Sequence, residues 1–577
     1  MNRRKFLVGS GAAIAATAAI DPLTAIAQSD NREIPGYGVS DANPKPLPTQ
    51  SNDLSPYTGT WSDKQIQHLL RRAMFGVSYS QLVTARSMGS MDALVTKLLT
   101  DAPLPALSSS WTTTVLQPDR SITDPVERQK DLTNKDRFNR FCELSLQAWW
   151  MEQMVGEQLS IREKMTLMWS NHFVTGFDSV KSVGYMYGYN QMLRRNALGN
   201  LKTFVFEMST DPAMLVYLNG NQNTYQVKNG KTINNINENF ARELMELFTL
   251  GIYDPKNPDE RNYSETDIQE AAKALSGWQQ TITAPLVGQF ISNLHNNENK
   301  TFFGQTGNWG LQDIINMIFA KNGGYNVAYF ICQKIYTSFV YWVANPTVVD
   351  AMAQKLISSN WEIKPVLDDL LKSAHFYDEN VIGAQLKSPA EFVFSIVREF
   401  GLTLPEYDSG EPINTGKTDG VGAIVYQDRN PSHSYLLSTM SKAFGQDLLN
   451  PPNVKGWAGA HAWVNTGTYP TRKGLAYLLL MYPNYFNGNA SRAKGVKITF
   501  EPLPWAMEIP NANTMTSSEI SNALSDAVLA FDLGPIESNT LKTVISNGLP
   551  DNDFYLDEGR VAQCAQVIAT FPEFQLL

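Results

Sequence analysis

The sequence predicts a mainly α-helical protein, a large multi-helix single body with a few short β-hairpins and long ordered loops. Many segments repeat apolar residues at helical spacing, whereas few alternate apolar and polar residues as strands do. Glycine follows several helical runs, where a left-handed C-terminal cap is expected. No internal repeat with a period of roughly 20 to 50 residues is visible, so we do not expect a solenoid.

The helical runs begin after residue 60 and continue to the C-terminus. SDKQ at 62–65 and SIRE at 160–163 have the pattern of N-terminal capping boxes, and SETD at 264–267 is a weaker match. Gly251 and Gly277 each follow a helical run. Helical spacing is also found at 141–155, 311–320, 326–342, 347–358, 364–373, 388–400, 433–449, 472–481, 517–531 and 558–570.

Strand signals are few and local. YQVKNGKTIN at 225–234 has Asn-Gly between alternating residues, which predicts a hairpin with a two-residue turn. GQFISNL and KTFFG, within 288–304, could add a second strand pair. PPNVKGWAGAHAWVNTGTYPTR at 451–472 is too rich in proline, glycine and tryptophan for regular structure, and long ordered loops of this kind often carry function.

The N-terminal residues have the pattern of an export signal. Arg3 and Arg4 precede an apolar run, and AIA at 25–27 supplies a small-x-small cleavage site, so we expect 1–27 to be a twin-arginine signal peptide. No later segment offers the roughly 20 apolar residues of a membrane helix. We therefore expect a periplasmic or extracellular protein, exported in the folded state, with no membrane span in the mature chain.

Composition divides the rest of the chain into two parts. Residues 28–60 are rich in proline, glycine, serine and asparagine, which predicts a linker or an arm on the surface. Residues 61–577 contain no second segment of that kind, so they form one large helical body or two closely packed lobes.

Charge and cysteine content exclude two classes of protein. The net charge is −9, and loss of the basic signal peptide makes it more negative, so nucleic acid would be repelled. The three cysteines are an odd number for an exported protein and lie far apart in sequence, so we do not expect a disulfide framework. We expect Cys142 and Cys332, which lie in apolar helical runs, to be buried and inert.

His172, in WSNHFVTG, is the first candidate for chemistry. In helical projection it falls on the same stripe as Ile161, Met165 and Met168, so the imidazole is expected to point inward. Two interpretations remain open: a core histidine bonded to a backbone carbonyl, or a ligand or acid–base group in an interior site.

Glu243 is the second candidate. Within NENFARELMELFTLG at 237–251 it lies at the margin of the apolar stripe, whereas Glu238 and Arg242 are spaced for an ion pair on the solvated face. A carboxyl group at that margin could have a raised pKa or hold a cation, or it could form an ordinary salt bridge.

A basic cluster lies on the first predicted helix, in HLLRRAMFG at 68–76. His68, Arg71 and Arg72 share one side, opposite the aliphatic residues. Two guanidinium groups beside an imidazole suit an anion or carboxylate, and the alternative is a solvated helix face. We assign His68 to catalysis and the arginines to substrate binding.

Two loops complete the candidate site. HNNENKTFFG at 295–304 supplies His295, a candidate metal ligand, and Lys300, a candidate substrate contact. Exposed tryptophans in the 451–472 loop would stack on a sugar ring while amides bind its hydroxyl groups, or they could simply anchor the loop. The candidates in that loop are Asn453, Lys455, Trp457 and Trp463.

Several stretches together resemble an exported bacterial family, domain of unknown function 1800. They are HLLRRAMFG, NENFARELMELFTLG, ETDIQEAAKALSGW, NKTFFG, LKSPAEFVFSIVREFG, FGQDLLNPPNVKGWAGAHAWVNTGT and FPEFQ. The resemblance implies no agreed activity. It suggests a co-exported partner of the domain of unknown function 1501 family, which is similar to sulfatase- and phosphatase-type hydrolases. Asn296 stands where the first family usually has aspartate, which weakens a metal site there.

Two functions remain open. In the first, His172, Glu243, His68 and His295 converge on a pocket under the 451–472 loop and hydrolyse a carbohydrate or cell-envelope polymer by acid–base chemistry, with or without a divalent metal. In the second, the protein is a non-catalytic glycan-binding or assembly partner of the co-exported hydrolase-like protein. A common cavity for His172, Glu243 and His68 would favour the first, and separate pairing of each would favour the second.

Overall fold

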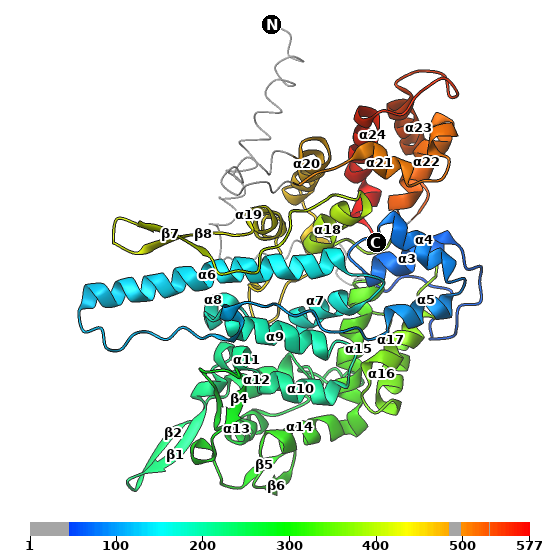
Figure 1. The fold of residues 1–577 in the computed structure, drawn as a ribbon. Coiled ribbons are helices and arrows are strands. Elements are labelled where there is room, and N and C mark those ends of the chain that lie inside the picture. Colours follow the sequence, from blue (N-terminus) through cyan, green and yellow to red (C-terminus); the bar gives the residue numbers. More distant parts are fainter. Residues whose placement is uncertain (1–44, 484–497, 530) are drawn as a thin grey trace.

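The computed structural model describes residues 45–483, 498–529 and 531–577, and helices dominate it (Figure 1). The first group of helices is α3 (Asp63–Ala73), α4 (Tyr79–Ser87), α5 (Met91–Leu98), α6 (Pro125–Gly156), α7 (Arg162–His172), α8 (Phe177–Val180), α9 (Val183–Arg195), α10 (Leu201–Ser209), α11 (Pro212–Tyr217) and α12 (Asn239–Glu246). Then follow α13 (Glu265–Ala274), α14 (Leu311–Ala320), α15 (Tyr325–Phe339), α16 (Pro346–Ser358), α17 (Ile363–Leu371) and α18 (Pro389–Glu399). The C-terminal part contains α19 (Pro431–Ser434), η5 (Tyr435–Ser441), η6 (Ala460–Trp463), α20 (Thr468–Met481), α21 (Pro502–Met507), α22 (Ser517–Val528), α23 (Pro535–Ser546) and α24 (Glu558–Thr570). The prediction of a mainly α-helical fold is confirmed.

The strands in the described residues form separate two-stranded antiparallel hairpins. They are β1 (Thr224–Lys228) with β2 (Lys231–Asn235), β3 (Trp278–Gln280) with β4 (Gly288–Phe290), β5 (Lys300–Phe302) with β6 (Gln305–Gly307), and β7 (Ile413–Thr418) with β8 (Ile424–Gln427). Lys228 pairs with Lys231 across Asn229 and Gly230, both at positive φ, so the predicted Asn-Gly hairpin is confirmed. The second expected pair is wrong, because β4 and β5 each pair with a different neighbour.

Helix α6 runs across the middle of the molecule (Figure 1). Its N-terminal half projects with the β7–β8 hairpin beside it, and its C-terminal half, from Cys142 to Met154, enters the core. Helices α7 to α17 lie on one side of α6 in this view, and α20 to α24 lie on the other. The buried apolar side chains of both sides belong to one continuous cluster that extends from Ile66 to Phe574.

The two strongest capping boxes of the sequence are absent and the weakest is present. Ser62 bonds the side chain of Gln65 and no backbone N–H, and α7 begins at Arg162 with Ile161 as its N-cap. In α13, Ser264 and Asp267 exchange both capping hydrogen bonds. Gly251 and Gly277 adopt the predicted positive φ, 73° and 91°. Gly251 N–H donates back to the Met245 carbonyl of α12 as a cap does, whereas Gly277 N–H donates to the Asn223 carbonyl and does not cap α13.

Helix α3 is buried on all sides from Gln65 to Ala73, so the alternative of a solvated face for its basic cluster is wrong. His68, Arg71 and Arg72 are at most 1% exposed. Their bonded groups contact protein atoms, namely the Phe376 and Val381 carbonyls and the Glu399 carboxylate of α18, whereas His68 Nδ1 and Arg72 Nε have no partner in the described residues. The sequence pattern of a single helix cannot reveal such contacts.

The predicted signal peptide, 1–27, and the first part of the predicted linker lie outside the described residues. The described part, 45–60, lies along the 372–378 segment. Tyr57 N–H donates to the carbonyl of Lys372 over 2.8 Å, and Gln50 N–H donates to the carboxylate of Asp378 over 2.7 Å. In the described parts of the chain, none of the helices has the length and apolar character to cross a membrane.

Candidate functional site

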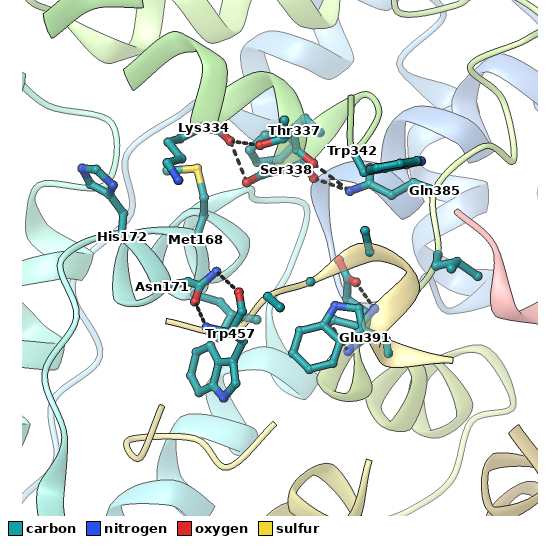
Figure 2. Close-up of a pocket in the computed structure, with 18 of the residues that line it drawn as sticks. Met168, Asn171, His172, Lys334, Thr337, Ser338, Trp342, Gln385, Glu391 and Trp457 are labelled. Atoms are coloured by element: carbon teal, nitrogen blue, oxygen red, sulfur yellow. Dashed lines mark hydrogen bonds between the residues drawn. The ribbon is translucent and has the colours of Figure 1, made fainter. Parts of the chain in front are cut away.

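An open cavity of about 660 Å³ lies between α7, α15, the segment 384–391 and the loop 455–463. Figure 2 shows the labelled side chains around it: Lys334, Thr337 and Ser338 come from α15, and Asn171 with Trp457 lies opposite them. Segments more than 280 residues apart in sequence therefore build one site.

The loop is seated on α7 through Asn171. The Asn171 Oδ1 atom accepts the backbone N–H of Trp457 over 2.7 Å, and its Nδ2 group donates to the Trp457 carbonyl over 3.5 Å. Gly456 has a φ of +79°, and a Cβ atom there would lie 2.2 Å from Asn171 Oδ1. Only glycine fits this approach without displacing the loop.

The sugar-stacking interpretation expected exposed tryptophans in the loop, but both are buried. Trp457 and Trp463 line the cavity but are only 6% and 8% exposed, because each packs into the core beneath the loop. Trp342 and His461 form a second aromatic pair in the wall, edge to face, with ring centroids 4.8 Å apart. The Trp342 indole N–H is buried and lacks a hydrogen-bond partner in the described chain.

Lysine side chains give the cavity wall its charge. Lys164 of α7 and Glu391 of α18 form a nearly buried ion pair, and Glu391 Oε2 also accepts the backbone N–H of Ser388 over 2.6 Å. Burial, with the charges of Arg72 and Lys387, lowers the pKa of Lys164 well below its usual range. The pair is neutral overall whichever partner holds the proton.

Lys334 and Lys455 are open to solvent at the cavity wall. In the part of the chain that the structure describes, neither ammonium group has a carboxylate within ion-pair distance. The surrounding protein lowers the pKa of Lys334. Burial and Glu246 raise the pKa of Glu243, and the charge of Lys455 partly offsets that rise.

His172 lines the cavity and is 6% exposed, so its predicted inward orientation is confirmed. Its Nε2 lies 3.2 Å from the carbonyl of Phe248, which can only accept, so Nε2 carries the proton and Nδ1 is an acceptor. The rings of Phe173, Phe248 and Phe330 surround it. Burial, with the nearby charge of Lys334, lowers the pKa of His172 to about 3, so the imidazole is neutral near pH 7.

The other predicted acid–base groups do not line this cavity. Glu243 lies on α12, half-buried, and burial together with Glu246 raises its pKa. His68 is fully buried, with Nε2 3.0 Å from the carbonyl of Phe376, and burial and Arg72 lower its pKa. The expected convergence of His172, Glu243 and His68 is therefore not found.

The arginines of α3 bind protein groups. Arg71 contacts Glu399 over 3.3 Å and donates to Gln67 over 2.5 Å. Arg72 donates to the side-chain oxygen of Gln385 and, over 2.7 Å, to the Val381 carbonyl. Gln385 lines the cavity, so Arg72 lies directly behind the wall without reaching its surface.

His295 and Lys300 form a separate cluster at the β5–β6 hairpin. His295 Nδ1 contacts the carbonyl of Ser276 over 2.9 Å, and its Nε2 lies 3.5 Å from Lys300 Nζ. Lys300 also donates to the Asn296 carbonyl over 2.5 Å, and burial lowers its pKa to about 8. A neighbouring ammonium group disfavours a cation at His295, and no three His, Cys, Asp or Glu side chains of the described chain are grouped as metal ligands.

Asn453 is exposed outside the cavity lining, where its Oδ1 accepts the Lys455 N–H over 2.8 Å and closes a turn. Residues that sequence reasoning missed supply much of the wall, and they are Lys164, Asn171, Lys334, Trp342, Gln385 and His461. Two of them lie beside features that the sequence already identifies: Asn171 directly precedes His172, and His461 lies within the 451–472 loop. Lys334, Trp342 and Gln385 come from distant segments and carry no local signal.

Fold and site together define a mainly helical protein with a large open cavity under an anchored loop. The chain belongs to the family described as "Protein of unknown function (DUF1800)", which matches residues 68–576. Comparison with curated proteins gives no match, and comparison with solved structures gives none either.

Proposed function

We propose that this protein is a non-catalytic binding protein that holds a segment of a glycan or related cell-envelope polymer in the cavity between α7, α15 and the 455–463 loop. One observation carries the proposal: the candidate acid–base groups lie apart from one another. His172 is bonded to the Phe248 carbonyl, His68 is bonded to the Phe376 carbonyl, and Glu243 lies outside the cavity lining. Groups held in this way cannot act on a single substrate.

The cavity has the size and chemistry of a binding site. Its volume of about 660 Å³ is typical of sites for small ligands or short chain segments. Trp342 and His461 offer aromatic surface, and the hydroxyl groups of Thr337 and Ser338 lie in the same wall. Aromatic surface beside hydroxyl and amide groups suits a sugar, which has both apolar faces and polar edges.

Acid–base hydrolysis is the less supported alternative. A base with a pKa of about 3 gives little driving force for removing a proton from water near pH 7. The Nε2 atom of the same ring is already bonded to the Phe248 carbonyl. His172 therefore supports the position of α7 against the segment that follows α12 better than it would support catalysis.

The proposed setting follows from the sequence. We propose export by the twin-arginine route to the periplasm or beyond, since the residues that suggest it, Arg3 and Arg4, precede an apolar run and a cleavage site. A co-exported hydrolase-like protein of the domain of unknown function 1501 family would then cleave the polymer that this protein holds.

The test is binding measured together with turnover. Labelled neutral and acidic oligosaccharides of about three to six sugars are titrated into the protein, and reducing ends are counted after long incubation. We expect saturable binding without new reducing ends, lost in Trp342→Ala and kept in Trp309→Ala, a partly buried tryptophan outside the cavity. Release of reducing ends that His172→Gln abolishes would overturn the proposal in favour of hydrolysis.

A further inference from the structure

The charge of the cavity wall is unbalanced. Of the described residues that line it, three are lysines and one is a glutamate. Lys164 and Glu391 neutralise each other, which leaves the ammonium groups of Lys334 and Lys455. Both are open to the cavity, and the chain as a whole carries a net charge of −9, so a local excess of positive charge is not explained by composition.

A second layer of cations lies behind this wall. Arg71 and Lys387 contact one carboxylate, Glu399, at 3.3 and 3.7 Å. Arg72 has no carboxylate within ion-pair distance in the described chain and bonds neutral oxygens, including that of Gln385 in the wall. The charge of Arg72 contributes to the lowered pKa of Lys164, so this layer acts on a group of the cavity wall. Buried cations without partner carboxylates raise the potential in a neighbouring cavity, because little water screens them.

A donor without an acceptor lies in the same wall. The indole N–H of Trp342 is buried against the cavity and has no partner in the described residues. A buried donor left unsatisfied costs free energy, and an oxygen atom of a ligand would remove that cost. Figure 2 places Trp342 beside Gln385, whose oxygen Arg72 occupies.

We propose that the ligand of this cavity is an anion, an acidic glycan whose carboxylate or phosphate group is held by the ammonium groups of Lys334 and Lys455. The inference rests on the proposed binding function and names the chemical class of its ligand. Lysine attracts anions as a point charge without selecting their shape, so carboxylate and phosphate belong to the same class here. Glu243, near Lys455, is the carboxyl group that opposes the attraction.

The experiment compares two ligands with the same sugar chain, one with charged carboxylates and one with neutral methyl esters. Trigalacturonate and its fully methyl-esterified form are titrated into the full-length protein by calorimetry at low and high salt. We expect the acid to bind at least tenfold more tightly than the ester, and its Kd to rise with salt. Lys334→Gln and Lys455→Gln should each raise the Kd of the acid about tenfold. Lys97→Gln, which changes an exposed lysine on α5, should leave that Kd unchanged.

The outcomes separate the two proposals. Equal binding of acid and ester would overturn the anionic inference and leave the glycan-binding function in place. If inorganic phosphate binds, Lys334→Gln abolishes that binding and neither trigalacturonide binds, the anion site is supported and the glycan-binding function is overturned. Failure of trigalacturonate, its ester and phosphate to bind would overturn both. Circular dichroism of each variant confirms that a lost affinity is not lost folding.

Discussion

The side chain of Asn171 holds the backbone of Trp457 at both its N–H and its carbonyl, across 286 residues of sequence. This contact joins α7, which carries Lys164 and His172, to the loop that carries Lys455 and His461. The position of the loop, and with it the shape of the cavity, therefore depends on one amide and on the glycine that lets it approach.

Replacing Gly456 by alanine should displace the loop. The new Cβ atom would lie 2.2 Å from Asn171 Oδ1 and 2.7 Å from the Asn171 carbonyl oxygen, at a φ that disfavours side chains. We expect a loss of about 1–3 kcal/mol in the free energy of unfolding and a weaker affinity for any cavity ligand.

The matched control is Gly474→Ala. Gly474 lies within α20, and nothing is within 4 Å of the added Cβ, so alanine should stabilise the helix by about 0.5–1 kcal/mol. Denaturant unfolding of both variants measures the difference. Equal stability of the two would contradict the seated loop.

The ion pair between Lys164 and Glu391 should behave as a buried unit. Lys164→Met leaves the carboxylate nearly buried without its cation and should cost about 3–5 kcal/mol, whereas adding Glu391→Gln to it should recover most of that loss. A double-mutant cycle in urea measures the coupling, and additive losses would show that the two groups do not interact.

Stability should fall in acid partly because of His172. Burial holds its pKa at about 3 in the folded protein, below the ordinary 6.5, so only the unfolded chain takes up this proton between those values. The stability that the neutral His172 contributes to the folded protein is fully present above pH 6.5. It is lost as the pH falls toward 3, at up to about 1.4 kcal/mol of unfolding free energy per pH unit.

His172→Gln isolates this effect, because the amide can still donate to the Phe248 carbonyl but does not titrate. Between about pH 7.5 and pH 5, the wild type should lose roughly 2 kcal/mol more unfolding free energy than the variant. His68, His295 and His375, whose pKa values are also lowered, titrate alike in both proteins and cancel. Parallel pH profiles would mean that His172 protonates freely in the folded state.

The cysteines should be inert in the folded protein. Cys142, Cys332 and Cys564 are buried and unpaired, as expected for the first two, and burial raises the pKa of each, that of Cys564 to about 12. A thiol reagent at neutral pH should label none of them before unfolding and all three after it. Rapid labelling of the native protein would place a thiol at an accessible surface.

The helical phase of apolar residues predicted side-chain orientation and helix span in some helices but not in others. It placed His172 inward and assigned the span of α14 and α24 correctly, because periodic apolar residues report which face meets the core. It failed for α3 after the first turn, since from Gln65 onward that helix is surrounded by protein and has no solvated face to identify. Arg71 bonds Glu399 and Arg72 bonds Gln385, each more than 300 residues away in sequence.

The site itself was only half predictable. The 451–472 loop signalled function through its composition, and Lys455, Trp457 and Trp463 do line the cavity. Lys334 and Trp342 belong to α15 and the turn after it, where they look like ordinary residues of an amphipathic helix. Their importance comes from tertiary packing that brings α15 opposite α7, and local sequence contains no record of it.

Hydrogen–deuterium exchange with and without saturating trigalacturonate tests most directly whether the cavity is the ligand site. Bound ligand should slow exchange in 455–463 and in 333–339, the two walls that carry Lys455 and Lys334, and leave α22 to α24 unchanged. Protection confined to other segments, or no protection at a ligand concentration that saturates binding, would contradict the account.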